Sequence, residues 1–196
     1  MSSTQDFFDI LQTVTIDCKD NGEYFTVTDR VAVIERMLAG SCYRLVAREP
    51  LALLYAKREL CEGDRVLLIS SHIDCLYRAC FCNDEGDCLR GTFDNSFSNA
   101  ALLWNMLNDR LPDNVVVAFT GNEESDSQGA VQAVVALGRM GCEVPAALVL
   151  DVTNEAMTFT GIPILSRNLL PLWQRLLKVY GAVFSPGISG AGANIP

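Results

Sequence analysis

Apolar residues in the central part of the chain follow two alternating patterns. Short continuous runs, such as "VLLISS" and "VVVAFTG", are separated by longer stretches in which apolar residues recur every three or four positions. The runs are typical of strands buried on both faces, and the longer stretches are typical of amphipathic helices. The alternation predicts an α/β fold, a three-layer sandwich in which helices cover both faces of a mainly parallel central sheet.

The same pattern gives the expected position of each element. The expected strands are 64–71, 114–121 and 146–153, and the expected helices are 28–40, 94–111 and 127–141. Two shorter apolar runs, 42–49 and 51–57, are split by Pro50 and predict antiparallel strands near the N-terminal part, the first of them at the sheet edge. A further strand over 156–165, a helix over 168–181 and a Gly-rich loop over 185–196 are expected after them.

Composition limits the size and surroundings of this fold. A chain of 196 residues that is 49% apolar fits one domain with a full core, so we expect a single domain over 1–196. A net charge of −9 disfavours binding to nucleic acid. No apolar run has the roughly 18 to 20 residues of a membrane span, and the N-terminus does not resemble a secretory signal, so we expect a cytoplasmic protein without a membrane partner. The composition leaves homo-oligomerisation open.

Eight cysteines occur in the chain, and four of them lie close together in "CLYRACFCNDEGDC". A domain of this size and apolarity needs no disulfides, so reduced thiols are expected. In this segment Cys80 and Cys82 would share one face of a strand, and Cys88 would return across a turn in a hairpin. A zinc site that includes Cys75 is the alternative, although the spacing matches no common zinc motif.

Polar residues with metal-binding chemistry follow the expected strands. His72, the only histidine, and Asp74 end the first buried run; Glu123 and Glu124 follow the second, and Asp151 ends the third. The carboxyl ends of the strands in such sheets are where ligands bind.

A sixth polar residue, Asp94, lies at the start of an expected helix. Five of the six, all except Asp74, have a structural explanation when taken alone: a buried histidine, a helix cap, first-turn acids or a turn former. Taken together, their order along successive elements is what a pair of divalent metal ions requires. Zinc accepts imidazole nitrogen and carboxylate oxygen, and one carboxylate can bridge two ions.

Two of the acidic residues have expected roles that require no direct contact with the metal. Asp74 projects to the same face as His72 and can hold the other ring nitrogen, which fixes the orientation of the imidazole. Glu123, next to a ligand at Glu124, can act as a general base toward a water activated by zinc.

Four segments, "SSHIDCLY", "RGTFDNSFSNAALL", "AFTGNEESDSQGA" and "LVLDVT", resemble the metal-binding signatures of the co-catalytic zinc exopeptidases, and the resemblance covers about residues 64–153. It is closest to the compact aminopeptidase branch, with a phosphorylase/hydrolase-like fold. The resemblance implies that His72 and Asp151 hold one zinc ion, that Asp94 bridges, that Glu124 holds the other ion, and that Glu123 is the base. The implied substrate is a peptide or an amino-acid amide, with one or two zinc ions and with cobalt or manganese as substitutes.

The sequence departs from that pattern at the second metal. Members of the superfamily supply another histidine after the last matched aspartate, whereas this chain has none and ends at Pro196. We therefore expect a zinc-peptidase-like domain that is incomplete at its C-terminal end, with a tight ion at His72 and a weaker one at Glu124. Two hypotheses follow: a metal-dependent aminopeptidase-like hydrolase, or an inactive or truncated relative that serves in binding or assembly.

Overall fold

A computed structural model describes residues 3–16, 28–77, 79–86 and 89–152. Internal contacts divide the chain into two units, residues 1–152 and residues 153–196. The strand expected over 156–165, the helix over 168–181 and the C-terminal loop lie outside the described residues. The single domain expected over 1–196 therefore stays a prediction, and the first unit is described below.

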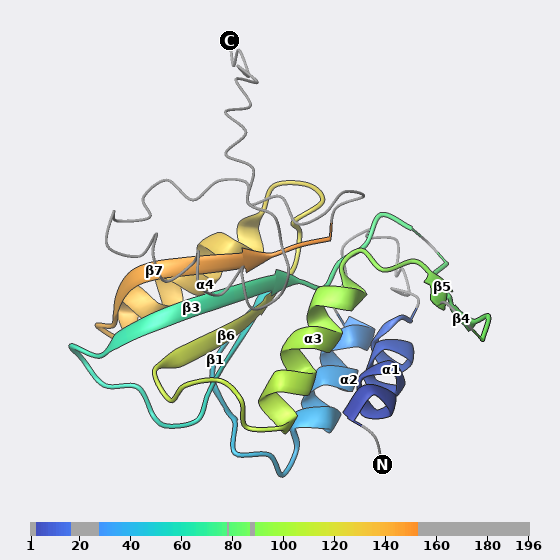
Figure 1. Ribbon diagram of the computed structural model, residues 1–196. Coiled ribbons are helices and arrows are strands. Elements are labelled where there is room, and N and C mark those ends of the chain that lie inside the picture. Colours follow the sequence, from blue (N-terminus) through green and yellow to red (C-terminus); the bar gives the residue numbers. More distant parts are fainter. Residues whose placement is uncertain (1–2, 17–27, 78, 87–88, 153–196) are drawn as a thin grey trace, which may run out of the picture. The chain divides into compact units, whose positions relative to one another are not determined.

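Two helices and five strands come first along the described chain, and helices and strands alternate from α3 onward (Figure 1). The helices are α1 (Ser3–Val14), α2 (Thr28–Leu38), α3 (Ser96–Leu107) and α4 (Gln128–Arg139). The strands are β1 (Arg44–Glu49), β2 (Ala52–Ala56), β3 (Arg65–His72), β4 (Cys82–Asp84), β5 (Leu89–Gly91), β6 (Val115–Thr120) and β7 (Glu143–Leu150).

Five strands form one sheet in the order β1-β2-β6-β3-β7. Strand β3 pairs in parallel with both β6 and β7, while β2 pairs antiparallel with β1 and β6. Every strand of this sheet except β2 therefore runs in the same direction. The predicted α/β fold with a mainly parallel sheet is confirmed, and β1 lies at the sheet edge as predicted.

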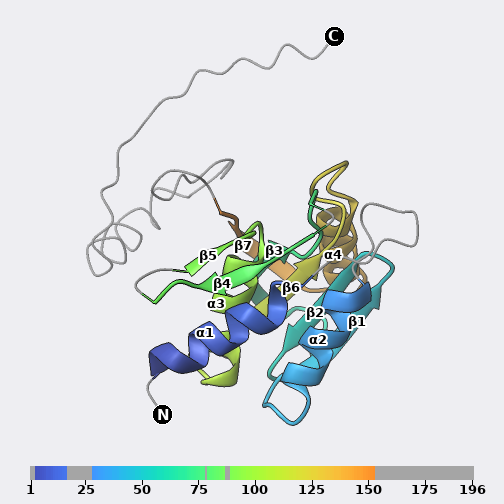
Figure 2. The same ribbon diagram turned by 90° about the vertical axis from the view of Figure 1, so that its right-hand side faces the viewer.

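Helices cover both faces of the sheet, with α4 on one face and α1, α2 and α3 on the other (Figures 1 and 2). The side chains of β6 pack alternately on the two faces of the sheet. Val115, Val117 and Phe119 face the layer of α1, α2 and α3. Val116 and Ala118 face α4. Side chains alternate across a strand, so a strand between two helical layers must be apolar at every position. The sheet is thereby buried on both sides at its centre.

Two elements differ from the expected positions. Helix α1 was not predicted, although its buried residues Ile10, Leu11 and Val14 have helical spacing. Strand β7 begins at Glu143 rather than at residue 146 and so includes Pro145. Among the described strands β7 pairs only with β3, and an edge strand tolerates a proline because the outer row of its backbone groups has no strand partner.

The predicted cysteine hairpin is confirmed, because β4 and β5 pair antiparallel around a turn with Gly86 at φ 90°. The prediction that Cys80 and Cys82 share one strand face is wrong, because β4 begins at Cys82. Cys80 instead turns its sulfur toward that of Cys75, 3.8 Å away. Cys88 lies outside the described residues.

In the described part of the chain, none of the helices combines the length and the apolarity that a membrane crossing requires.

The start of α4 packs tightly against the end of β6 at Gly129. The backbone N–H of Gly129 donates to the carbonyl of Gly121, whose N–H donates to the carbonyl of Leu51. A Cβ at Gly129 would overlap these backbone atoms, whereas a Cβ at Gly138 in the same helix would meet nothing within 4 Å. We expect Gly129→Ala to lower the free energy of unfolding by about 1–3 kcal/mol.

Gly138→Ala is the matched control and should raise the free energy of unfolding by up to about 1 kcal/mol, because alanine favours the helix over glycine. Urea unfolding of both variants measures the difference. Equal stability of the two variants would contradict the close packing at Gly129.

Candidate metal centre

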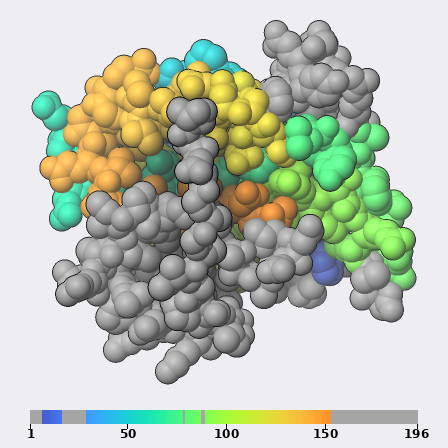
Figure 3. Space-filling view, turned by 90° about the horizontal axis from the view of Figure 1, so that it is seen from above, coloured from blue at the N-terminus to red at the C-terminus, as the bar shows by residue number. Residues whose placement is uncertain are grey.

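The six candidate residues come from four places in the chain that meet at one edge of the sheet. His72 is the last residue of β3, Asp151 follows β7, and Glu123 and Glu124 lie in the turn after β6. Asp94 precedes α3. In the view from above, the end of β7 (deep orange) appears between the segment after β6 (yellow) and the segment before α3 (green) (Figure 3). Parallel strands explain this convergence, since their carboxyl ends share one edge.

One group of potential ligands surrounds the Nε2 atom of His72. This atom lies 3.2 Å from Oδ1 of Asp94 and 3.4 Å from Oδ1 of Asp151. The three ligand atoms all lie within 4.8 Å of one another. Ligand atoms about 2.1 Å from a tetrahedral zinc ion are separated by about 3.4 Å, so the two distances from Nε2 of His72 suit a shared ion.

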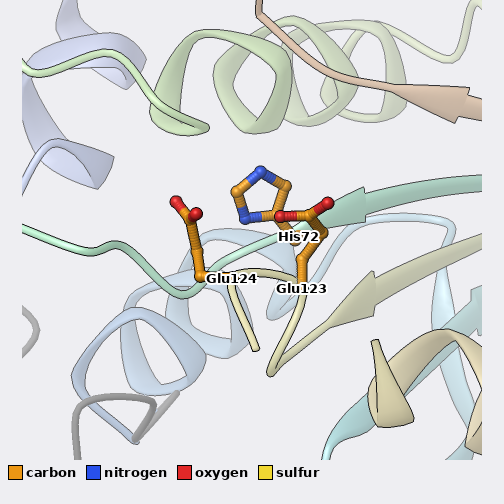
Figure 4. Close-up of side chains that lie close together, drawn as sticks. All are labelled: His72, Glu123 and Glu124. Carbon is orange, nitrogen blue, oxygen red and sulfur yellow. The ribbon is translucent and has the colours of Figure 1, made fainter. Parts of the chain in front are cut away.

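A second group joins the same imidazole to the turn after β6. Ligand atoms of His72, Glu123 and Glu124 also lie within 4.8 Å of one another. Both carboxylates rise from the turn toward the imidazole ring (Figure 4). Glu124 and Asp94 belong to different groups, although Asp94 is close enough to raise the pKa of Glu124.

Asp74 lies beside the ring of His72 and binds the turn after β6. Its side chain is fully buried, and its Oδ1 lies 3.4 Å from Nδ1 of His72, although the pair lacks hydrogen-bond geometry. The backbone N–H groups of Glu123 and Glu124 donate to its two oxygens, each at 3.2 Å. Burial raises the pKa of Asp74, but the imidazole and the two N–H groups outweigh this and lower it. The contact with the turn was not foreseen from the sequence.

Asp94 carries a buried oxygen that lacks a hydrogen bond. Its Oδ1 lies 3.2 Å from Nε2 of His72, but the geometry is not that of a hydrogen bond. No other donor among the described residues forms a hydrogen bond with this oxygen. Asn95, not Asp94, is the N-cap of α3, and no side-chain cap bond forms there. Helix capping therefore does not explain Asp94. A buried carboxylate oxygen without a donor, beside an imidazole nitrogen, fits a cation.

A buried hydrogen-bond network, not foreseen from the sequence, joins the elements that carry these ligands. Asn99 donates to the carbonyl of His72 (2.9 Å) and accepts from the hydroxyl of Ser71 (2.8 Å). Asn95 donates to the carbonyl of Leu150 (2.8 Å) and to Ser71 (3.1 Å). The network fixes the start of α3 against the ends of β3 and β7. Nothing local in the sequence indicates it, because its partners are 24 to 55 positions apart.

Electrostatics around His72 favour a positive charge. Burial lowers the pKa of His72, but the carboxylates of Asp74 and Asp94 outweigh it and raise the pKa to about 10. Burial raises the pKa of both Glu123 and Glu124, and neighbouring carboxylates add to the effect. Without a metal, a protonated imidazole supplies the positive charge among these acids. A divalent cation would take its place.

Zinc binding should therefore release a proton from His72. The metal needs a neutral nitrogen, while the pKa of about 10 keeps the metal-free ring protonated at pH 7. Below that pKa, we expect the affinity for zinc to rise up to about tenfold per pH unit, with about one proton released per ion. Calorimetry at pH 7.5 in buffers of different ionisation enthalpy counts the protons. Zinc binding without proton release would show that His72 is not the ligand.

Comparisons with known proteins place the fold. The sequence matches no protein-family profile and no curated protein. The structure is similar to that of the aminopeptidase PepT from Bacillus cereus ATCC 10987, with a TM-score of 0.56 and 14% sequence identity. The similarity covers 80% of this chain and 45% of PepT, so the chain spans less than half of that enzyme's length. At this identity the likeness shows the fold alone.

Proposed function

We propose that this chain is the metal-binding part of an aminopeptidase-like peptide hydrolase. The observation that carries the proposal is the position of Nε2 of His72, which lies between carboxylate oxygens of Asp94 and Asp151 at distances that suit a zinc ion. The fold shared with an aminopeptidase supports the same class of reaction. The proposed substrates are peptides or amino-acid amides.

In this proposal each residue has a defined task. His72, Asp94 and Asp151 hold the tighter ion, which is zinc or, as a substitute, cobalt or manganese, and Glu124 holds a weaker second ion. A bound zinc ion lowers the pKa of a coordinated water to about 7 and polarises a carbonyl oxygen. Asp74 keeps the imidazole in the orientation that leaves Nε2 free for a ligand.

Glu123 is the proposed general base. Its carboxylate lies in one group with His72 and Glu124, close to the ligands. Partial burial and the surrounding acids raise its pKa, which suits a group that takes a proton from water and passes it to a leaving amine. The backbone N–H of Glu123 is fixed by Asp74, so the position of the base depends on the same aspartate as the imidazole.

One observation favours a second function, in which the chain binds or assembles without catalysis. His72 is the only histidine of the sequence, so within this chain two ions would compete for one imidazole, and the ion at Glu124 has none of its own. Side-chain oxygens and water would then fill out the second site, and the weakly held second ion would leave a chain that binds metal without turnover. The two functions share the zinc site at His72 and differ in turnover.

A hydrolysis assay of the full chain with amino-acid amides and dipeptides distinguishes the hydrolase function from the binding function. The metal-free protein is supplied with zinc, cobalt or manganese, and release of the free amino acid is followed. The proposed hydrolase predicts turnover that a chelator abolishes and that added metal restores. Zinc binding without turnover supports the binding function, and absence of both contradicts the metal centre itself.

A further inference from the structure

Two thiols lie side by side next to the metal centre. Cys75 directly follows Asp74 and is 2% exposed, while Cys80 is partly exposed. Their sulfur atoms are 3.8 Å apart. A disulfide needs a separation of about 2.05 Å, so a shift of about 1.8 Å would bring the two sulfurs to bonding distance. Cys80 is partly exposed and lies outside any described strand.

A buried arginine faces the more exposed thiol. The Arg30 side chain is 2% exposed, and its Nη2 lies 3.5 Å from the sulfur of Cys80. The same guanidinium donates to the carbonyl of Ile73 (3.1 Å) and to that of Ile16 (3.4 Å). In the described residues no carboxylate forms an ion pair with Arg30. A thiolate at Cys80 would complement this positive charge, and the thiolate is the reactive form of cysteine.

Other cysteines have different surroundings. Cys42 lies 3.6 Å from a carboxylate oxygen of Asp109, which disfavours a thiolate, and burial together with that carboxylate raises the pKa of Cys42. The sulfur of Cys142 lies 3.9 Å from the carbonyl oxygen of Cys61. Neither candidate metal group among the described residues includes a cysteine.

We propose that Cys75 and Cys80 are a redox modification site that forms a reversible disulfide when the protein meets hydrogen peroxide. The Cys80 thiolate attacks one peroxide oxygen, the O–O bond breaks, and Cys80 sulfenic acid and hydroxide form. The Cys75 sulfur then displaces the hydroxyl group, which leaves as water with the Cys75 proton, and the S–S bond forms. Two thiols are oxidised by two electrons and one peroxide is reduced to two waters. A dithiol reverses the change.

The sequence makes this bond easy to detect. Trypsin cleaves after Arg65, Arg78 and Arg90, so Cys75 lies in the peptide 66–78 and Cys80 in the peptide 79–90. The full-length protein is reduced, freed of reductant, treated with a small excess of hydrogen peroxide, alkylated and digested without reduction. Mass spectrometry should find the two peptides joined through Cys75 and Cys80, and dithiothreitol should separate them.

Two serine variants test the assignment. In Cys82→Ser, which changes a neighbouring thiol of the same peptide, the joined peptides should still form. In Cys80→Ser they should disappear, and Cys75 should be recovered as the alkylated thiol. Recovery of alkylated Cys75 from the oxidised parent protein, a bond from Cys75 to another cysteine, or a bond that dithiothreitol does not open would each overturn the proposal. None of these results depends on the proposed hydrolase function.

Discussion

Replacing His72 by alanine should remove zinc binding at the candidate centre. His72 is the only nitrogen ligand available, and its Nε2 is the atom that both Asp94 and Asp151 approach. Two half-exposed carboxylates remain after the substitution, and they cannot supply the mixed nitrogen and oxygen set that zinc prefers. We expect the dissociation constant for zinc to increase by more than about 100-fold, beyond the effect typical of a residue that only orients a ligand.

Competition with a chromophoric chelator measures this change, and Asp74→Asn is the control. Asparagine keeps the size of the aspartate but removes the negative charge that faces Nδ1 of His72. Because Asp74 orients a ligand and is not one itself, the expected loss is about 10- to 100-fold. If zinc binds His72→Ala as tightly as the parent, the ion is held elsewhere and the proposed centre is wrong.

Replacing Glu123 by glutamine should abolish hydrolysis and leave zinc in place. The amide keeps the shape of the side chain and the backbone N–H that donates to Asp74. It cannot accept a proton, so the rate for amino-acid amides should fall by about 10²- to 10⁴-fold, the usual contribution of a general base. The zinc content of the variant should equal that of the parent protein.

The matched control changes the neighbouring acid. Glu124→Gln keeps the proposed base and weakens the second ion, so its activity should recover as the metal concentration is raised. Added metal should not restore Glu123→Gln. Hydrolysis by Glu123→Gln at the parent rate would show that this carboxylate is not the base.

Much of the fold could be predicted because its strongest signals are local. The run from Val115 to Thr120 is apolar at nearly every position, which is typical of a strand between two layers of helices. His72 and Asp151 could be assigned to the carboxyl edge of the sheet for the same reason, because each comes at the end of such an apolar run. Helix α1 carried a usable signal too, in the helical spacing of Ile10, Leu11 and Val14.

The remaining features depend on contacts between distant positions. The side chain of Asn95 donates a hydrogen bond to the carbonyl of Leu150, 55 positions later. The carboxylate of Asp74 accepts one from the backbone N–H of Glu124, 50 positions later. A polar residue looks the same in the sequence whether it binds solvent or a distant backbone group, so these contacts appear only in the folded chain. The position of Cys80 was mispredicted for a related reason. Its neighbours Cys75 and Arg30 are brought to it by the fold, and no strand periodicity places them there.

The most direct test is a crystal structure of the zinc-soaked protein, with anomalous scattering recorded on both sides of the zinc absorption edge. We expect a zinc peak about 2.0–2.2 Å from Nε2 of His72 and from carboxylate oxygens of Asp94 and Asp151, with a weaker peak beside Glu124. A zinc-saturated protein with no peak at His72, or with its peak only at cysteine sulfur, would show that His72, Asp94 and Asp151 do not form the metal centre.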